Sequence, residues 1–453
     1  MPRGDGGAEP AADARRSVAV VGGGLLGLTL AHRLAEAGRA VTVLESAGEI
    51  GGLASAWHID GLVWDRHYHV TLLSDLHTRG LLRDLDLEEE MAWVETRTGY
   101  YAGGRLFPAS NTIDFLRLPL ALTDKLRIAA TILLASRIRN WRKLEQTSVE
   151  AWLRRHSGNR AFERFWRPQL RAKLGDSFQD VSAAFIWATV QRLYAARRSG
   201  LKKELFGYVP GGYARVLDRF AEVLRDEGVD TRLGRPVTDV EASDRGVLVT
   251  LGGTGGVPDR ECFDEVVVTA PPPIAARLCA GLDAAERRRL EAVRYHGIVC
   301  ASVVLSRPLA GNYLTYIADE VPFTTVVEMS AFVDAAQFGG KTLAYLPKYV
   351  PSDDPLLDAT DEELEASFLP ALLRLYPHLS PGDIEHFQVS RVRYVFPVPT
   401  LGYSLSAPLT RTSQRGVFLV SSANIVNGTL NVDETVALAE RAATEVLTTT
   451  AGR

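Results

Sequence analysis

The sequence predicts an α/β fold, with a parallel sheet and a second, mixed α+β domain, from three observations. Residues 18–45 alternate a strand, a glycine-rich turn, a helix and a second strand. Strand-like runs recur at residues 229–233 and 264–271, whereas residues 96–205 are mostly helical in pattern. The chain has 453 residues, which is too long for one hydrophobic core. We therefore expect two domains.

The first element is a buried strand that leads into a glycine-rich turn. Residues 18–21 are an apolar run typical of a parallel strand, and residues 28–37 have helical periodicity. Between them Gly22, Gly24 and Gly27 form a GxGxxG motif. Gly22 permits a tight turn, Gly24 lets a pyrophosphate approach the backbone, and Gly27 lets the helix pack closely on the strand. The motif predicts that a dinucleotide binds at the helix N-terminus, beside Leu25 and Leu26.

The second strand, residues 40–44, ends at Glu45. A carboxylate about 20 residues beyond the glycines accepts hydrogen bonds from both hydroxyls of a ribose and would repel a 2′-phosphate. A glycine triplet by itself is a weak signal. Strand, glycines, helix, strand and acid in this order predict a Rossmann-like dinucleotide-binding domain.

The residues after Glu45 indicate which dinucleotide binds. The chain continues SAGEIGGLA, which contains Ser46, Gly51, Gly52, Leu53 and Ala54. This extension resembles the flavoprotein superfamily of amine oxidases, protoporphyrinogen oxidase, phytoene desaturases and UDP-galactopyranose mutase. In that family the loop runs beneath the pyrophosphate and ribityl chain of FAD. The resemblance therefore implies FAD rather than NAD as the cofactor.

The resemblance also implies an FAD-binding domain that is discontinuous in sequence, made of residues 17–95, 206–281 and 391–453. In such a domain Val237 would pack near the adenine. A helix beginning at Asn431 and Val432 would point its N-terminus at the pyrimidine end of the flavin, and Asn431 followed by Glu434 predicts a capping box there.

One position departs from the family pattern. The family usually has Gly-Asp at the end of its last strand, where the aspartate binds the ribityl hydroxyls, and this chain has Ser421-Ser422. Ser422 can still bind a hydroxyl but without the strength of a carboxylate, so we expect a lower affinity for FAD. Asn424 and Asn427 are the alternatives for that role.

Residues 96–205 and 282–390 are expected to form the substrate-binding domain, a sheet covered by a helical lid, with a small-molecule substrate at the junction with the flavin domain. Near that junction the segment Asp65-Arg66-His67-Tyr68-His69 aligns with the family's Asp-x-Gly-Pro-His. The resemblance implies that His69 is an active-site residue, and imidazole suits proton transfer that accompanies hydride transfer. The alternative is a histidine packed in a bend.

Arg393 and Tyr394 are further catalytic candidates. The family places the corresponding stretch, residues 391–397, against the flavin, and in the mutase branch arginines and tyrosines there hold the substrate diphosphate. The alternating pattern equally fits an ordinary strand. Tyr208, in the FGYVPGG stretch, is a further cavity candidate.

Two groups of cations indicate possible binding partners. If the first group faces the cavity it favours an anionic substrate, although a solvated helix face is the commoner arrangement. It consists of Arg167, Arg171, Lys173, Arg192, Arg197, Arg198, Lys202 and Lys203. The second group lies among apolar residues at 116–141 and indicates peripheral contact with a membrane surface.

Composition excludes several classes of function. The net charge of −4 gives no basis for binding nucleic acid, and no apolar window reaches the ~20 residues that span a membrane. The three cysteines, Cys262, Cys279 and Cys300, form no CxxC, so we expect no disulfide framework, no metal site and a cytoplasmic protein. Residues 1–16 are small and polar, as in a flexible leader.

Two functions remain. The first is an FAD-dependent oxidoreductase of the oxidase, dehydrogenase or desaturase type, which transfers a hydride from an organic substrate to flavin N5. The alternative is a flavin-dependent isomerase that resembles UDP-galactopyranose mutase and acts on a nucleotide sugar without net redox change. A binding protein that holds flavin without turnover is the third and weakest interpretation.

Overall fold

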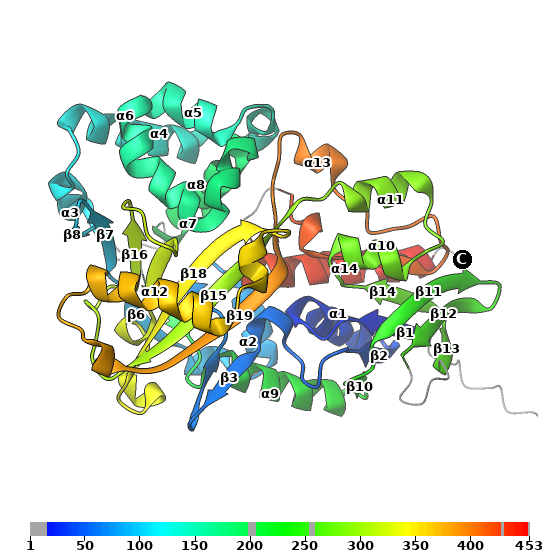
Figure 1. The fold of residues 1–453 in the computed structure, drawn as a ribbon. Helices are drawn as coiled ribbons and strands as arrows, with labels where there is room; N and C mark the ends of the chain where they lie inside the picture. The colour runs from blue at the N-terminus through cyan, green and yellow to red at the C-terminus, as the bar shows by residue number, and fades with distance from the viewer. Residues whose placement is uncertain (1–15, 198–204, 253–258, 427–429, 452–453) are drawn as a thin grey trace, which may run out of the picture.

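A parallel five-stranded sheet joins three distant segments of the chain in the computed structural model, which describes residues 16–197, 205–252, 259–426 and 430–451. The strand order is β10-β2-β1-β14-β20 (Figure 1). The strands are β10 (Asp230–Arg232), β2 (Ala40–Leu44), β1 (Ser17–Val21), β14 (Glu265–Val268) and β20 (Val417–Leu419). The predicted α/β fold with a sheet that is discontinuous in sequence is confirmed.

Alternate residues of β1 face two different layers. Val18 and Val20 pack against the helices α1 (Leu25–Glu36), α9 (Gly212–Asp226) and α14 (Val432–Ala451). Ala19 and Val21 pack against a three-stranded antiparallel sheet on the other face. That sheet consists of β11 (Val237–Ser243), β12 (Gly246–Leu251) and β13 (Asp259–Phe263), and α10 (Pro272–Leu278) and α11 (Ala284–Glu291) adjoin it. Because both faces are covered, β1 is a continuous apolar run rather than an alternating one.

A mixed sheet of seven strands forms the floor of the second half of the molecule. Its order is β19-β15-β18-β17-β16-β7-β8, and only the β16–β7 pair is parallel. The strands are β19 (Ile384–Pro397), β15 (Tyr295–Leu305), β18 (Thr342–Pro351), β17 (Thr325–Glu328), β16 (Leu314–Ile317), β7 (Thr98–Ala102) and β8 (Arg105–Pro108). The boundary predicted at residue 391 falls inside β19, which pairs with β15 on both sides of it.

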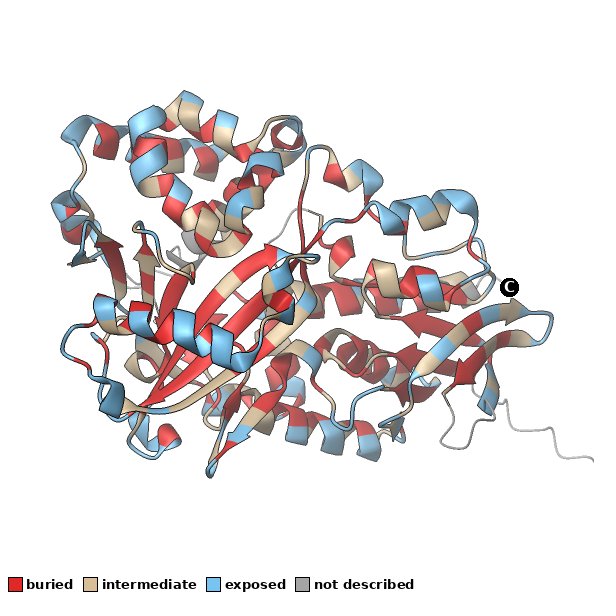
Figure 2. Ribbon diagram, viewed as in Figure 1, coloured by how far each residue is buried: buried red, intermediate tan, exposed pale blue. Residues whose placement is uncertain are grey.

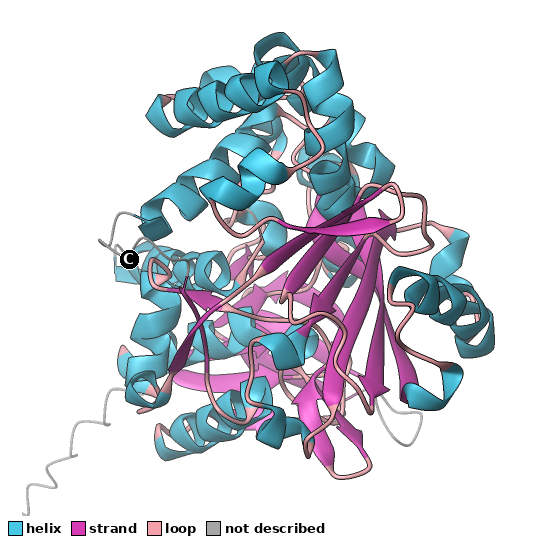
Figure 3. Cartoon of the chain, turned by 90° about the vertical axis from the view of Figure 1, so that its left-hand side faces the viewer, coloured by secondary structure: helices cyan, strands magenta, loops and turns pink. Residues whose placement is uncertain are grey.

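The two faces of this sheet have different covers. Val299, Ala301 and Val303 of β15 pack against α12 (Asp361–Leu375), and Ile298 and Cys300 face the core that the helical lobe shares. Figure 2 shows the buried strands between these covers, and Figure 3 shows the long strands beneath the helical lobe. The predicted sheet under a helical lid therefore exists, with one further helix on the opposite face.

The helical lobe is built from residues 112–197. It contains α3 (Thr112–Arg117), α4 (Leu122–Arg137), α5 (Val149–Ser157), α6 (Asn159–Ala161), α7 (Arg167–Leu174) and α8 (Ala183–Arg197). Between α6 and α7 the helical path is interrupted by a π-helical turn, Phe162–Trp166. Pro168 has no N–H to offer the Arg164 carbonyl, which instead accepts a hydrogen bond from the Tyr100 hydroxyl.

Short elements connect the two halves. The hairpin β3 (Ala56–Ile59) and β4 (Leu62–Asp65) is followed by β5 (Thr71–Leu72), which pairs with β9 (Leu205–Tyr208), and β9 pairs with β6 (Ala92–Glu95). Helix α2 (Leu76–Asp84) then packs on α14. Residues 65–71 are thereby held between the two large sheets.

Candidate active site

The glycine-rich turn has the geometry that the sequence predicts. Gly22 has φ +115°, and a Cβ there would lie 2.4 Å from Thr269 Oγ1. A Cβ on Gly27 would lie 2.0 Å from the Gly22 carbonyl oxygen. Both glycines are therefore required by the packing of the protein itself. At Gly24 the nearest protein atom to an added Cβ is Gly51 O at 4.0 Å, so this glycine keeps space open for a ligand rather than for the protein.

Glu45 closes the turn from the end of β2. Its Oε2 accepts a hydrogen bond from the Gly23 amide at 2.6 Å, and its Oε1 accepts from the Ala47 amide at 2.7 Å and from Ser46 Oγ at 3.1 Å. The Gly51 amide donates to Gly23 O at 2.8 Å. The acid and the Gly51–Gly52 loop thus lie against the first turn, as the resemblance implies.

The loop after the acid runs alongside the backbone of the first turn. Gly51 and Gly24 form an isolated parallel bridge, and a Cβ on Gly52 would lie 3.3 Å from Gly24 Cα. Leu53 and Ala54 complete a 3₁₀ turn that begins at Gly52. A Cβ on Gly51 would lie 2.5 Å from Leu217 Cδ1, so the glycines of this loop are required by its close contacts with the protein itself.

The second FAD segment meets the same corner. The Arg235 amide donates to the Glu45 carbonyl at 2.8 Å, and Val237 begins β11 two residues later. Val237 therefore lies beside the acid, on the side of the turn where the adenine end of a dinucleotide is expected.

The third segment brings α14 beside α1. Asn431 Oδ1 accepts from the Glu434 amide at 3.0 Å, so the predicted cap of the helix that begins at Val432 is present. Upstream, Ser422 Oγ lies 3.0 Å from the Tyr295 hydroxyl. Asn424 accepts from the Ser421 amide and donates to Pro408 O, so both of its polar ends bind its own loop. Asn427 lies outside the described residues.

These residues fit FAD. Helix α1 has no side-chain cap, so the amides of its first turn face the open side of Gly24, where a pyrophosphate would neutralise the helix dipole. When bound, FAD supplies a two-electron acceptor at N5.

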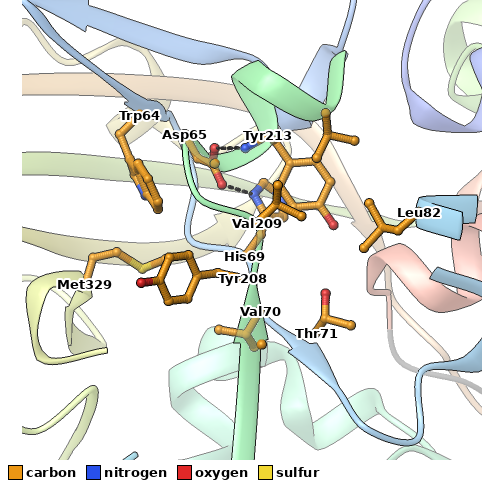
Figure 4. Close-up of a pocket in the computed structure, with 13 residues that line it drawn as sticks. Trp64, Asp65, His69, Val70, Thr71, Leu82, Tyr208, Val209, Tyr213 and Met329 are labelled. Atoms are coloured by element: carbon orange, nitrogen blue, oxygen red, sulfur yellow. Dashed lines mark hydrogen bonds and ion pairs between the residues drawn. The ribbon is translucent and has the colours of Figure 1, made fainter. Parts of the chain in front are cut away.

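A small cavity lies where residues 64–71 pass between the two sheets (Figure 4). It encloses about 20 Å³, enough for one water molecule. Its lining is mainly aromatic and aliphatic and consists of Trp64, Asp65, His69, Val70, Thr71, Leu82, Gly207, Tyr208, Val209, Gly212, Tyr213, Val216 and Met329. Both His69 and Tyr208, which the sequence singles out, lie in this lining.

His69 is held by a buried carboxylate. Its Nδ1 lies 3.2 Å from Asp65 Oδ2, and its ring is tilted against Tyr213 with centroids 4.8 Å apart. Asp65 is 2% exposed, and its Oδ1 accepts from the Tyr213 amide at 2.7 Å. The carboxylate favours the tautomer that carries hydrogen on Nδ1 and leaves Nε2 as a proton acceptor.

The two residues before His69 point elsewhere. His67 Nε2 lies 3.2 Å from Ser390 Oγ, and burial lowers the pKa of His67 to about 3, so this imidazole is neutral. The Tyr68 hydroxyl lies 3.3 Å from that of Tyr349, and burial raises the pKa of Tyr68. The first and last residues of this five-residue segment, Asp65 and His69, therefore line the cavity, while His67 and Tyr68 contact other parts of the protein.

Arg393 and Tyr394 lie away from this cavity. Arg393 is exposed on β19 and pairs with Asp358 and with the Ser352 carbonyl, at 3.2 Å. Tyr394 stacks edge-on against Tyr295, with centroids 5.8 Å apart, and so lies near Ser422. The structure places Tyr394 with the last FAD segment and Arg393 at the surface.

Three of the four members of the first cation group whose side chains the structure describes have carboxylate partners. Arg167 pairs with Glu163 at 2.9 Å, Arg171 with Asp176 at 3.0 Å, and Arg192 with the buried Asp75 at 2.7 Å. Lys173 Nζ instead lies 3.3 Å from the Tyr349 hydroxyl and over its ring, and it has no carboxylate partner within the described ranges. Arg198, Lys202 and Lys203, and the side chain of Arg197, lie outside what the structure describes.

Three features of the site were not found from the sequence. Tyr213 follows Gly211-Gly212 directly, so its place at a helix start was visible, but its contact with His69 was not. Asp65 was part of the motif without an assigned role. No pattern in the sequence indicated that Met329 lines the cavity.

The comparisons with known proteins agree with this geometry. The family described as flavin containing amine oxidoreductase matches residues 27–447. A coproporphyrinogen III oxidase of Mycobacterium tuberculosis (strain H37Rv) is 26% identical over 378 residues, which is 78% of this chain and 80% of that protein. Two solved structures share the fold. Wild-type putrescine oxidase bound to putrescine has a TM-score of 0.72 at 20% identity and covers 96% of this chain and 99% of its own. Reduced UDP-galactopyranose mutase has a TM-score of 0.73 at 15% identity and covers 96% of each chain.

Proposed function

Because this chain belongs to the flavin-containing amine oxidoreductases and is an FAD-dependent oxidoreductase, we propose that it dehydrogenates a substrate whose reacting carbon carries no amine, with His69 as the proton acceptor. The observation that carries the proposal is the Asp65–His69 pair in an otherwise apolar, aromatic lining. In the overall reaction the substrate loses a hydride and a proton and gains a double bond. FAD, when bound, would supply the acceptor for the hydride, and His69 Nε2 would take the proton.

Asp65 acts as a positioning residue. It is bonded to the Tyr213 amide and its carbonyl accepts from the Tyr345 hydroxyl at 2.6 Å, so its carboxylate is fixed from both halves of the molecule. A fixed carboxylate stabilises the imidazolium that forms when His69 takes a proton. The aromatic walls exclude water from this step.

The charges of the lining favour a C–H donor over an amine. Asp65 is the single carboxylate among the lining residues that the structure describes, and both of its oxygens have partners. An ammonium ion would therefore find no unpaired anion there. The relative that covers more than three quarters of this chain is named a coproporphyrinogen III oxidase, which supports a substrate of this kind.

Acidic groups on such a substrate could bind Lys173. It is the member of the first cation group that has no carboxylate partner among the described residues. Lys173 reaches Tyr349 and, through it, Tyr68 next to His69. We propose that an anionic substituent binds on this side of the site.

The mutase alternative is less well supported. The family and the oxidase relative favour net redox chemistry, and at 15% identity the likeness to the mutase concerns the fold alone.

The test is anaerobic mixing of the FAD-loaded enzyme with coproporphyrinogen III, putrescine or a UDP-galactose, while flavin absorbance is followed. We expect bleaching by the porphyrinogen only. Bleaching by putrescine alone would refute the C–H assignment, and product formation from the nucleotide sugar only after reduction by dithionite would support the mutase.

The role of His69 is tested with His69→Asn, and His77→Asn is the matched control because His77 is half exposed and pairs with Glu440 on the surface. We expect His69→Asn to bind FAD normally and to lower kcat by about 10²-fold or more, since a positioned proton acceptor contributes on that order. Unchanged kcat in His69→Asn would remove this residue from the mechanism.

A further inference from the structure

The first two helices of the lobe expose an unusual amount of apolar surface. Twelve large hydrophobic residues are exposed in the described part of the chain, and half of them lie between residues 113 and 134. They are Ile113, Leu116, Leu122, Leu126, Leu133 and Leu134, with exposed fractions from 40% to 64%. We call these six residues the α3–α4 face.

Helix α4 is apolar on two sides. Ile128, Thr131 and Ala135 are 1% exposed or less and face α5 and α8. Leu122 and Leu126 lie on the opposite side, since two residues along a helix are about 200° apart. A helix with one buried stripe normally carries polar residues on its other face. Here that face is apolar, and none of the described elements covers it.

The charges around the α3–α4 face have one sign. Every ionisable residue of 111–143 that is exposed is a cation, and none of these cations forms an ion pair within the described residues. They are Arg117, Arg127, Arg137, Arg139, Arg142 and Lys143. The two acids of the stretch are buried, and one of them, Asp124, is neutralised by Arg160 at 2.6 Å.

We propose that the α3–α4 face docks on the surface of a bilayer that contains anionic lipid. Exposed leucines flanked by cations are what an interfacial helix uses, because the apolar side enters the boundary of the acyl chains while arginines bind headgroups. No described helix has the length and apolarity to cross a membrane, so the contact is peripheral. Charge complementarity selects anionic lipid over a neutral surface.

The position of the lobe allows this contact. Figure 1 shows α3, α4, α5 and α6 together at one end of the molecule, and β11, β12 and β13 at the other. Docking through α3 and α4 therefore leaves the antiparallel sheet of the FAD-binding domain away from the bilayer.

The test is co-sedimentation of the FAD-loaded enzyme with vesicles of phosphatidylcholine alone or with about one third phosphatidylglycerol. We expect binding to the anionic vesicles, weakened about tenfold or more on neutral vesicles or at high salt. An enzyme that stays in the supernatant with both vesicles would overturn the proposal.

Two variants separate the apolar from the ionic contribution. Leu126→Gln with Leu133→Gln should lower vesicle binding about tenfold, whereas the matched pair Leu233→Gln with Leu409→Gln, exposed leucines beside β10 and β20 of the parallel sheet, should not. Arg137→Gln with Arg139→Gln should also weaken binding, and Arg288→Gln with Arg289→Gln on α11 should not.

Self-association is the competing use of this face. Light scattering of the same proteins without vesicles distinguishes the two. A dimer that is lost in Leu126→Gln with Leu133→Gln, together with no binding of vesicles by the unaltered enzyme, would assign the face to a second copy of the chain and refute the proposal.

Discussion

Acidification should destabilise this enzyme through His67 in particular. The imidazole belongs to the segment that carries His69 and is buried, with Nε2 3.2 Å from Ser390 Oγ. Burial is the main cause that lowers its pKa from 6.5 to about 3, and the nearby His69 and Arg66 lower it further. In the unfolded chain the same group has its ordinary pKa. The unfolded state therefore binds a proton first as the pH falls.

The sign and size of the effect follow from this difference. Above pH 6.5 both states are neutral at His67, and the full stability is present. Between pH 6.5 and about 3, protonation of His67 in the unfolded chain lowers the free energy of unfolding by about 1.4 kcal/mol for each pH unit. From pH 6.5 to pH 5.0 the loss assigned to His67 is thus on the order of 2 kcal/mol.

The assay compares urea unfolding of the FAD-loaded enzyme at pH 7.5 and pH 5.0 for the unaltered chain and for His67→Gln. Glutamine can still bond to Ser390 and does not titrate. We expect the free energy of unfolding to fall by about 2 kcal/mol more in the unaltered chain than in the variant. His58→Gln, at an exposed position, is the control and should not reduce the fall. Equal falls in the unaltered chain and His67→Gln would refute the assignment.

Other predictions concern the cofactor turn and one buried ion pair. Gly24→Ala should leave the stability of the FAD-free protein within about 1 kcal/mol, because the nearest protein atom to the new Cβ is 4.0 Å away, yet it should weaken FAD binding about tenfold or more, as measured by flavin retention. Gly27→Ala should destabilise the FAD-free protein itself, since its Cβ would lie 2.0 Å from Gly22 O; equal melting temperatures for the two variants would contradict this. Arg192→Met should cost roughly 3 kcal/mol by leaving the buried Asp75 carboxylate without its cation, and a loss below 1 kcal/mol in urea unfolding would show that the Leu72 amide alone satisfies it.

Short-range patterns were sufficient for the elements that carry FAD. Helix α12 shows the same kind of local signal, because a complete capping box at Thr360 and Glu363 marks its start. The close packing of Gly27 on the Gly22 carbonyl is likewise decided within six residues, because it depends on an absent Cβ atom and on the adjoining helix N-terminus. Such features need no distant partner.

Long-range contacts decided the rest. Tyr213 meets Asp65 across 148 positions of sequence, and Arg393 turns outward because β19 pairs with β15 and directs that residue toward Asp358. The π-helical turn depends on a tyrosine of β7, 64 positions away, which takes up the carbonyl of Arg164. The sequence by itself determined the dinucleotide site, because its turn chemistry is local, and the resemblance of the following loop implied that the dinucleotide is FAD. Only the tertiary structure decided which side chains surround His69, because strand pairing and packing bring together residues that no local pattern relates.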